Sequence, residues 1–219
     1  FRQAAKIGTN FTDTDLREMF KRSRQAGIQA EKTMFEATKK INTHKGAIFS
    51  LGLFVCASAY CQRHRDLDEF EVISKMTQGL VNHDLGQKSD TAGERQFLKY
   101  GKGGVRAEAE AGYPIVKNVA LPFLAKSTGE LNTRLLDTLM KIVRQIEDSN
   151  LIKRAGNIQV VKWSHEQAEK YLDLGGYGTA AGKEFMQELN RIFKEKNYSL
   201  GGSADILIIT IFMALQRKI

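Results

Sequence analysis

Only two prolines, Pro114 and Pro122, interrupt the 219 residues of this chain. Proline removes a backbone donor and breaks regular structure, so a chain with few prolines can form long uninterrupted helices. An all-β sandwich needs many turns, which clusters of proline and glycine usually mark. The scarcity of proline therefore argues against a turn-rich β fold and favours helices.

Apolar residues recur at helical spacing along most of the chain, and no stretch alternates polar and apolar residues for more than about five positions. This pattern predicts an all-α fold, a single globular bundle-like domain of roughly ten helices over residues 1–219. The helical patterns cover residues 16–20, 28–39, 47–64, 67–81, 105–111, 157–174 and 179–194, with others ending at Tyr100 and at Glu147 and a last one from Gly201.

Helix boundaries are predicted from two capping boxes and one polar segment. A hydroxyl residue followed three positions later by Glu occurs at Thr91–Glu94 and at Ser127–Glu130, and each is predicted to start a helix. The polar residues Asn82–Asp90 are predicted to form a loop.

The chain is basic, with a net charge of +8 at neutral pH. An excess of positive charge favours an anionic partner: a nucleic acid, an acidic surface or a phosphate-rich small molecule. A basic surface without a specific role is the alternative. No helix has a clear recognition face of Arg, Lys, Asn and Gln, which disfavours DNA binding.

Two cysteines, Cys56 and Cys61, are too few for a disulfide framework, which favours a reducing, cytoplasmic location. Their spacing is no zinc pattern, so we interpret them as buried thiols. The longest apolar runs, Ala47–Cys61 and Ala204–Leu215, are shorter than the roughly 20 residues that span a bilayer. No membrane partner is predicted.

Two polar segments in the first half of the chain interrupt apolar helices. Asn42–Gly46 precedes a buried helix, where backbone N–H groups, a Lys and a His could bind phosphate. An ordinary cap by Asn42 or Thr43 is the alternative. In Gly104–Pro114, small residues alternate with charges, and Arg106 could simply pair with Glu110 four residues on.

Two further polar segments lie in the second half. Glu147–Asn150, with Lys153 and Arg154 nearby, could hold a metal and a phosphate, or could be a cap with Asp148 or Ser149 at the helix start. Gly201–Asp205 precedes an apolar run, so its glycines could bring N–H groups to an anion. Asp205 either complements the helix dipole or binds Mg²⁺ or a ligand hydroxyl.

These segments together, in this order, resemble the triphosphoribosyl-dephospho-CoA synthase family. The resemblance runs from about residue 25 to the end of the chain. It rests most strongly on the strings N-T-H-K-G-A-I-F and G-G-S-A-D, and the residues that carry it are Asn42–Phe49, Arg106–Pro114, Ala120–Pro122, Asp148–Asn150 and Gly201–Asp205.

The resemblance implies a fold, a reaction and partners. The enzyme would be all-α and would join the triphosphoribosyl group of ATP to the ribose 2′-hydroxyl of 3′-dephospho-CoA, releasing adenine. The product would be the precursor of the prosthetic group of citrate lyase or of malonate decarboxylase, passed on to an acyl-carrier-protein transferase. Mg²⁺ is the expected cofactor, a homodimer is left open, and a non-catalytic nucleic-acid-binding module is the alternative function.

The resemblance also suggests site residues. Glu108 or Glu110 would be the general base, and His44 would orient a phosphate or the adenine. Asp148 and Asp205 would bind Mg²⁺. The phosphate- and nucleotide-binding residues would be Asn42, Thr43, Lys45, Gly46, Arg106, Arg154, Gly201, Gly202 and Ser203.

The chain departs from the family pattern at several points. Ala107, Ser149, Ala155 and Leu200 replace the usual Gly, Thr, Gly and Pro. A Lys-Pro-Gly segment and a Ser-Gly-x-His-x-Asp-Met segment, usual upstream, do not occur. We therefore expect this chain to be the C-terminal three quarters of a longer enzyme.

Overall fold

The computed structural model describes residues 1–85, 97–101 and 103–219. This part of the chain contains helices and turns and no β-strand, so the predicted all-α fold is confirmed. In the described ranges, no helix is both long and apolar enough to cross a membrane.

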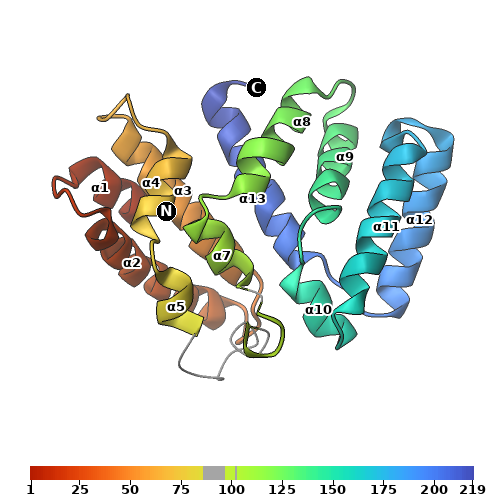
Figure 1. Cartoon of the computed structure of the whole chain (residues 1–219), viewed down its shortest axis with the longest axis horizontal. Coiled ribbons are helices and arrows are strands. Elements are labelled where there is room, and N and C mark those ends of the chain that lie inside the picture. Colours follow the sequence, from red (N-terminus) through yellow and green to blue (C-terminus); the bar gives the residue numbers. More distant parts are fainter. Residues whose placement is uncertain (86–96, 102) are drawn as a thin grey trace. The chain divides into compact units, whose positions relative to one another are not determined.

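Contacts between residues divide the chain into two compact units. Unit 1 comprises Phe1–Lys88 and Val105–Tyr113, and unit 2 comprises Ser89–Gly104 and Pro114–Ile219. Figure 1 colours their helices along the sequence. The single domain over residues 1–219 stays a prediction.

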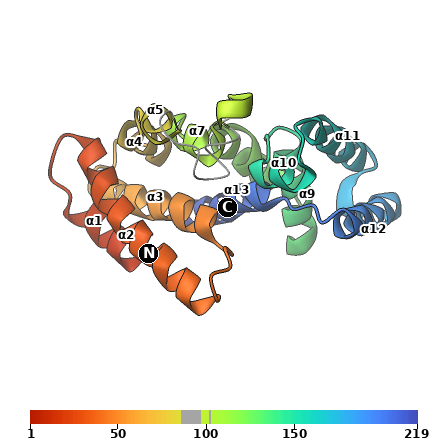
Figure 2. The same ribbon diagram turned by 90° about the horizontal axis from the view of Figure 1, so that it is seen from below.

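The helices of unit 1 surround α3, which has apolar residues on nearly every side. This helix packs against α1, α2 and α4, and Figure 2 shows α1 and α2 on one side of it and α4 on the other. The helices of unit 1 in the described residues are α1 (Arg2–Asn10), α2 (Leu16–Ala37), α3 (Lys45–Cys61), α4 (Glu69–Met76), α5 (Leu80–Leu85) and α7 (Gly104–Glu110).

The contact between α1 and α3 depends on a glycine. A Cβ atom added at Gly8 would lie 2.0 Å from the carbonyl oxygen of Cys56, far inside any real contact. Only the absence of a side chain lets the two helices approach so closely. Gly8 is therefore a packing residue of unit 1.

Tyr113 holds the end of the α7 segment in the core of unit 1. It is fully buried, its ring lies 5.1 Å from that of Phe54, and Phe54 in turn lies 5.5 Å from Phe70. The Tyr113 hydroxyl donates a hydrogen bond to Ser50 Oγ at 2.9 Å, which satisfies its polar atom inside the core. This aromatic cluster fixes residues 105–113 against α3 and α4.

The two cysteines lie buried in α3 as free thiols, which confirms their interpretation from the sequence. Burial raises the pKa of each thiol to about 12, with nearby carboxylates adding to the shift at Cys61. Both thiols therefore stay protonated at neutral pH and are poor nucleophiles.

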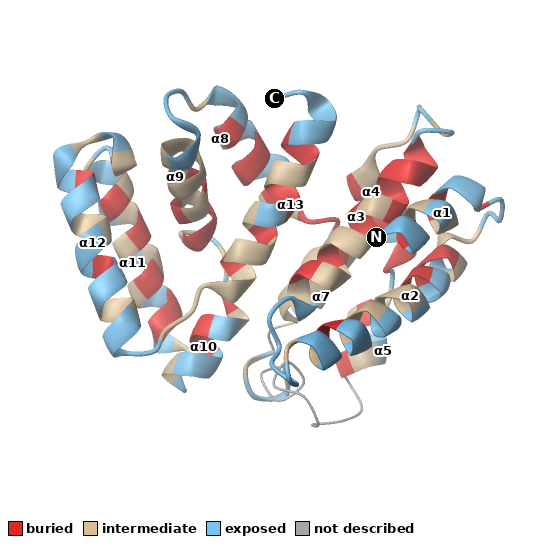
Figure 3. Cartoon of the chain, turned by 180° about the vertical axis from the view of Figure 1, so that it is seen from behind, coloured by how far each residue is buried: buried red, intermediate tan, exposed pale blue. Residues whose placement is uncertain are grey.

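Unit 2 is organised around α13, which packs against α8, α9, α10 and the π-helical turn η1. Figure 3 shows α12 as mostly exposed or intermediate, whereas α13 carries buried residues along its length. The helical elements of unit 2 in the described residues are η1 (Val116–Ala120), α8 (Leu121–Lys126), α9 (Leu131–Val143), α10 (Ser149–Ala155), α11 (Gln159–Asp173), η2 (Gly176–Gly178), α12 (Ala180–Glu195) and α13 (Gly201–Arg217).

One apolar cluster joins three of these helices. Met140 and Val143 come from α9, Ala168 and Tyr171 from α11, and Leu189 from α12. All five are buried, so α12 is held to unit 2 through a narrow apolar stripe although most of its surface is polar.

Several predicted boundaries are wrong. The predicted helix 67–81 is two helices, because Gly79 adopts a φ of 79° between α4 and α5. Residues 82–85 of the predicted loop Asn82–Asp90 belong to α5, and the remainder lies outside the described residues, as does the capping box at Thr91–Glu94. The predicted patterns 16–20 and 28–39 belong to one helix, α2, which ends at Ala37, and α1 was not predicted.

The capping box at Ser127–Glu130 does not form. Helix α9 begins at Leu131 with Glu130 at its N-cap and no side-chain cap. The Ser127 hydroxyl instead donates to the carbonyl of Leu124 and accepts from Arg134 Nε at 3.0 Å. Ser127 therefore closes α8 rather than opening α9.

Candidate functional site

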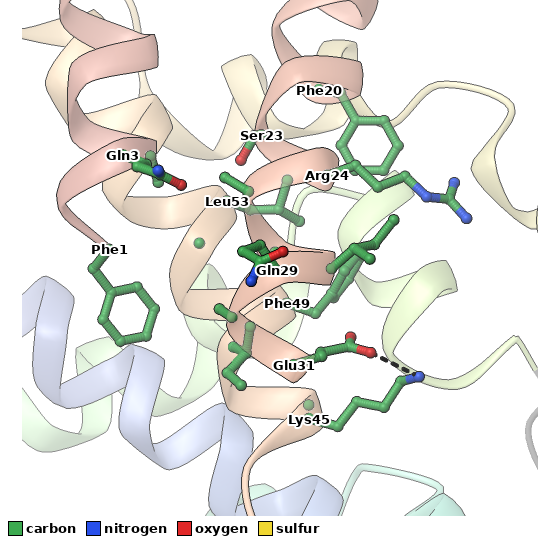
Figure 4. A pocket seen from close by; sticks show the side chains of 18 of the residues that line it. Phe1, Gln3, Phe20, Ser23, Arg24, Gln29, Glu31, Lys45, Phe49 and Leu53 are labelled. Atoms are coloured by element: carbon green, nitrogen blue, oxygen red, sulfur yellow. Dashed lines mark ion pairs between the residues drawn. The ribbon is translucent and has the colours of Figure 1, made fainter. Parts of the chain in front are cut away.

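Unit 1 contains a cavity of about 600 Å³ between α1, α2, α3, α5 and α7. This volume is in the range of sites for small molecules and cofactors. Figure 4 shows Phe20, Phe49 and Leu53 among its apolar lining, with the Arg24 guanidinium and the Lys45–Glu31 ion pair as polar groups. The charged side chains of the lining are Arg2, Arg24, Glu31, Lys45, Asp84 and Arg106.

The start of α3 reaches this cavity. Lys45 and Gly46 are the first residues of the helix and line the cavity. The side-chain oxygen of Asn42 accepts a hydrogen bond from the Lys45 N–H at 3.1 Å, but the N-cap residue of α3 is His44, so the predicted N-cap at Asn42 or Thr43 is wrong. Lys45 Nζ lies 3.0 Å from a carboxylate oxygen of Glu31 and remains 48% exposed.

His44 occupies the N-cap position of α3, but its side chain makes no capping bond. Its Nδ1 lies 2.6 Å from Thr43 Oγ1, and its backbone N–H donates to the sulfur of Met34 at 3.2 Å. Neither His44 nor Thr43 is part of the cavity lining. Their proposed roles toward ligand stay predictions.

Arg106 does line the cavity, where it pairs with Asp84. The predicted alternative, a pair with Glu110, is wrong, because Arg106 Nε donates to Asp84 Oδ2 at 3.0 Å and Glu110 is held elsewhere. Arg24 donates to the same carboxylate through both Nη atoms, at 2.8 and 3.0 Å. Burial alone would raise the pKa of Asp84, but hydrogen bonds from Arg24, His83 and Arg106 outweigh it and hold that pKa below its ordinary value.

Glu110 caps a short helix. Its carboxylate accepts hydrogen bonds from the backbone N–H groups of Gly79 and Val81 at 2.8 and 2.9 Å, at the start of α5. Glu108 and Glu110 both belong to α7, and their side chains lie about 200° apart around the axis of that helix. Neither carboxylate is part of the cavity lining.

In unit 2, Asp148 caps two helices at once. Oδ1 accepts from the N–H groups of Asn150 and Leu151 at 2.9 and 3.1 Å, and from Gly202 at 3.2 Å. Oδ2 accepts from the N–H and the hydroxyl of Ser203 at 2.7 and 2.8 Å. The predicted capping role of Asp148 is confirmed, and five hydrogen bonds compete with any cation for its oxygens.

Asp205 lies two residues after Ser203 in α13, and its carboxylate has different surroundings from that of Asp148. Among the described residues, no hydrogen bond or ion pair reaches its carboxylate. Burial raises its pKa to about 6, with the negative charge of Asp148 adding to the shift. A cation beside this carboxylate would offset both effects. Within the described ranges, however, no group of three or more His, Cys, Asp or Glu side chains could hold a metal ion.

The glycines before Asp205 allow close packing. A Cβ at Gly201 would lie 2.7 Å from Asn150 Nδ2, and one at Gly202 would lie 3.1 Å from Asp148 Oδ1. The two glycines therefore let α13 approach the start of α10. Arg154, at the end of α10, donates to the side-chain oxygen of Asn197 at 2.9 Å on the exposed surface.

The structure thus brings together Lys45, Gly46 and Arg106 in unit 1, and Asp148, Gly202 and Ser203 in unit 2. Sequence reasoning missed four charged residues of the cavity: Arg2, Arg24, Glu31 and Asp84. Arg24 and Glu31 lie in a polar, charged helix, and Asp84 was assigned to a loop. Apart from their charge, no local signal distinguishes them from solvated residues.

Comparisons with known proteins identify the family. The family model described as CitG: ATP:dephospho-CoA triphosphoribosyl transferase matches residues 1–219. A relative from Lactiplantibacillus plantarum, named "Probable 2-(5''-triphosphoribosyl)-3'-dephosphocoenzyme-A synthase", is 52% identical over 225 residues, covering 100% of this chain and 80% of the relative. "Protein CitXG" from Leuconostoc mesenteroides subsp. cremoris is 51% identical over 222 residues, covering 97% of this chain and 48% of the relative.

No solved structure matches the chain. The family model matches every residue, and two relatives are 52% and 51% identical to the chain. These matches favour the transferase family over the nucleic-acid-binding alternative. The chain belongs to the ATP:dephospho-CoA triphosphoribosyl transferase family.

Proposed function

We propose that this chain joins the triphosphoribosyl group of ATP to the ribose 2′-hydroxyl of 3′-dephospho-CoA, and that the cavity of unit 1 binds phosphate groups in that reaction. One observation carries the assignment of phosphate binding to the unit 1 cavity. Lys45, Gly46 and Arg106 come from two separate sequence segments that carry the family resemblance, and all three line the same cavity. Both substrates are strongly anionic, and a chain with a net charge of +8 attracts them electrostatically.

Phosphate binding falls to the cations and to the start of α3. Lys45 and Arg106 would neutralise phosphate oxygens, and the N–H of Gly46 in the first turn of α3 would donate to them. Asn42, by capping the Lys45 N–H, holds this turn in place. Thr43 and His44 stay candidates for orienting a phosphate or the adenine.

The reaction is a substitution at the anomeric carbon C1′ of the ATP ribose. The bond from C1′ to the adenine nitrogen breaks and a bond to the acceptor oxygen forms, through a transition state with oxocarbenium character. The acceptor hydroxyl loses a proton, and the leaving adenine gains one, which calls for a general base and an acid. No covalent intermediate is required.

Glu108 and Glu110 are the proposed bases, and the contacts of Glu110 favour Glu108. Both oxygens of Glu110 already accept hydrogen bonds from the start of α5. If Glu110 accepted a proton, its carboxylate would lose its negative charge, and those hydrogen bonds would become weaker. Separate Glu108→Gln and Glu110→Gln variants distinguish the two: the base variant lowers kcat, whereas the capping variant lowers stability.

Mg²⁺ remains part of the proposal, with Asp205 as the residue that fits it better. Its carboxylate has the raised pKa expected of an anion that lacks a compensating cation. Asp148 stays a weaker candidate because of its five hydrogen bonds. When bound at Asp205, Mg²⁺ would offset the buried negative charge of that carboxylate within unit 2.

The remaining proposals concern unit 2 and the partners. Arg154, Gly201, Gly202 and Ser203 stay candidates for phosphate binding. The product would become the prosthetic group of citrate lyase or of malonate decarboxylase after transfer by an acyl-carrier-protein transferase. We also retain a homodimer as an open option, and a cytoplasmic location on the grounds of the free thiols.

The decisive experiment identifies the products. Incubation of the chain with ATP, Mg²⁺ and dephospho-CoA should release free adenine, without ADP or pyrophosphate. Pyrophosphate instead of adenine would indicate adenylyl transfer and overturn the proposal. Tight, steeply salt-dependent binding to random oligonucleotides without adenine release would support the nucleic-acid-binding alternative.

A further inference from the structure

We propose that Arg24 is a further phosphate-binding residue of the unit 1 cavity, and that Asp84 is a positioning residue that holds Arg24 and Arg106 as a paired guanidinium site for a polyphosphate. The proposal rests on the proposed function, since it names the substrate group that the cavity takes. It adds two residues from segments outside the motifs that carry the family resemblance.

The geometry of the three side chains is that of one carboxylate shared by two cations. Arg24 binds Asp84 through both Nη atoms, and Arg106 binds it through Nε. Asp84 is only 7% exposed, whereas Arg24 and Arg106 are 40% and 25% exposed. The carboxylate is therefore enclosed, and the guanidiniums present the accessible surface.

Asp84 cannot neutralise both arginines. Its lowered pKa keeps it fully ionised at neutral pH, so the trio carries one net positive charge. Among the described residues, four basic side chains and two carboxylates line the cavity, and both carboxylates are already paired. Two positive charges are therefore left uncompensated along the cavity lining, where Arg24 and Lys45 remain 40% and 48% exposed.

The orientation of Arg24 is fixed from two sides. Asp84 holds its Nη atoms, and the ring of Phe20 lies 5.8 Å from its guanidinium carbon. In Figure 4 the Arg24 guanidinium and the Lys45 ammonium both extend toward the right of the view, Arg24 above and Lys45 below. Cations at separated points of one cavity suit a chain of phosphates better than a single one.

Two substrates could supply that chain, namely the triphosphate of ATP and the diphosphate of dephospho-CoA. Arginine matches phosphate geometry with two parallel donors, which a lysine cannot do. Binding of each substrate, and of inorganic tripolyphosphate, is therefore measured separately by calorimetry. The substrate whose affinity depends on Arg24 is the one whose phosphates the site takes.

The first variant is Arg24→Gln, with Arg22→Gln as its control. Arg22 lies on the same helix and is exposed outside the cavity, so both variants remove one charge from α2. We expect Arg24→Gln to weaken binding of tripolyphosphate and of one substrate by about tenfold or more, because a hydrogen-bonded charge contact is lost. Arg22→Gln should change binding by less than about twofold.

A double variant separates phosphate binding from a structural role. Arg24→Gln alone leaves the Asp84 carboxylate poorly compensated, which lowers stability whatever Arg24 does. Adding Asp84→Asn removes that carboxylate and should recover the melting temperature. If Arg24 contacts phosphate, the double variant binds tripolyphosphate more weakly than Asp84→Asn alone. Equal affinity of these two variants would overturn the phosphate-binding role.

Asp84→Asn alone tests the positioning role against simple electrostatics. Removing a negative charge from a cation-lined cavity should tighten anion binding if charge alone matters. If Asp84 orients the guanidiniums, affinity for tripolyphosphate falls several-fold instead. Tighter binding by Asp84→Asn would overturn the positioning role.

The outcome also separates this inference from the proposed function. Binding of polyphosphate that depends on Arg24, without adenine release, would support the inference and reject the reaction. Adenine release with substrate affinities unaffected by Arg24→Gln would support the reaction and reject the inference. If the wild-type chain binds neither substrate nor tripolyphosphate, both are rejected.

Discussion

Asp148 and Ser203 lie 55 residues apart in the sequence and are joined by two hydrogen bonds inside unit 2. One oxygen of the carboxylate accepts from the backbone N–H and the hydroxyl of Ser203, while the other accepts from the first turn of α10. A single buried side chain therefore satisfies the N-termini of two helices, α10 and α13.

Replacing Asp148 should destabilise unit 2 strongly. Asp148→Ala removes the cap of α10 and leaves N–H groups of α13 buried without an acceptor, so we expect a loss of about 2–4 kcal/mol in the free energy of unfolding. Urea denaturation measures this loss. The exposed Asp173→Ala is the control and should stay within about 0.5 kcal/mol of the wild type. An equal effect of the two variants would contradict the double-cap interpretation.

The raised pKa of Asp205 predicts a pH-dependent stability. The folded-state pKa is about 6 and the ordinary value is 3.8. Between these values the folded chain holds a proton that the unfolded chain has lost, so stability falls as the pH rises and the full penalty is present above about pH 6. Asp205→Asn should therefore match the wild type below about pH 3 and exceed it by about 1–3 kcal/mol above about pH 7.

The same variant tests the proposed Mg²⁺ site. Addition of Mg²⁺ at neutral pH should raise the melting temperature of the wild type, because the ion binds the folded state and offsets the buried charge. It should leave Asp205→Asn unchanged. Equal stabilisation of both proteins would remove Asp205 from the metal site.

Lys45→Ala should weaken ATP binding more than it changes folding. The Lys45–Glu31 pair is partly exposed, and such pairs contribute about 0–1 kcal/mol. A phosphate contact from the same ammonium is worth about 1.5–3 kcal/mol, or a tenfold or larger change in Kd. Calorimetry with ATP and thermal unfolding measure the two effects. Lys32→Ala, on an exposed position of α2, is the control.

Two glycines of unit 1 should respond to alanine with opposite signs. At Gly8 the added Cβ would collide with the carbonyl oxygen of Cys56, so Gly8→Ala should cost about 1–3 kcal/mol. Gly27 lies within α2 and has nothing within 4 Å of the added Cβ, so Gly27→Ala should stabilise by about 0.5–1 kcal/mol. Denaturation of the two variants side by side checks the contrast.

Local features of the fold could be predicted from the sequence because they depend on neighbours along the chain. The pattern over 179–194 predicted α12 to within one residue at each end, and Thr179 is its N-cap. The pattern from residue 16 predicted the start of α2 at Leu16, and Asp15 is the N-cap of that helix. Periodicity and capping chemistry act over one or two turns, so sequence alone contains them.

Relationships between distant segments could not be predicted in the same way. Arg24 and Asp84 are 60 residues apart, and their pairing depends on how α2 and α5 pack. The i, i+4 spacing suggests that Arg106 pairs with Glu110. Arg106 instead pairs with Asp84, because the Glu110 carboxylate accepts hydrogen bonds from the start of α5. Motif spacing indicated which segments matter without indicating which side chains meet.

The helix α5 has six residues, which is too short to be stable in water by itself. Its start is held by Glu110 and its Asp84 by Arg106, so two side chains of α7 secure it from both ends. Its amide hydrogens should consequently exchange with solvent deuterium together with those of α7, in one opening event rather than two. The part of the cavity lining that carries Asp84 therefore depends on the packing of residues 105–113 against the rest of unit 1.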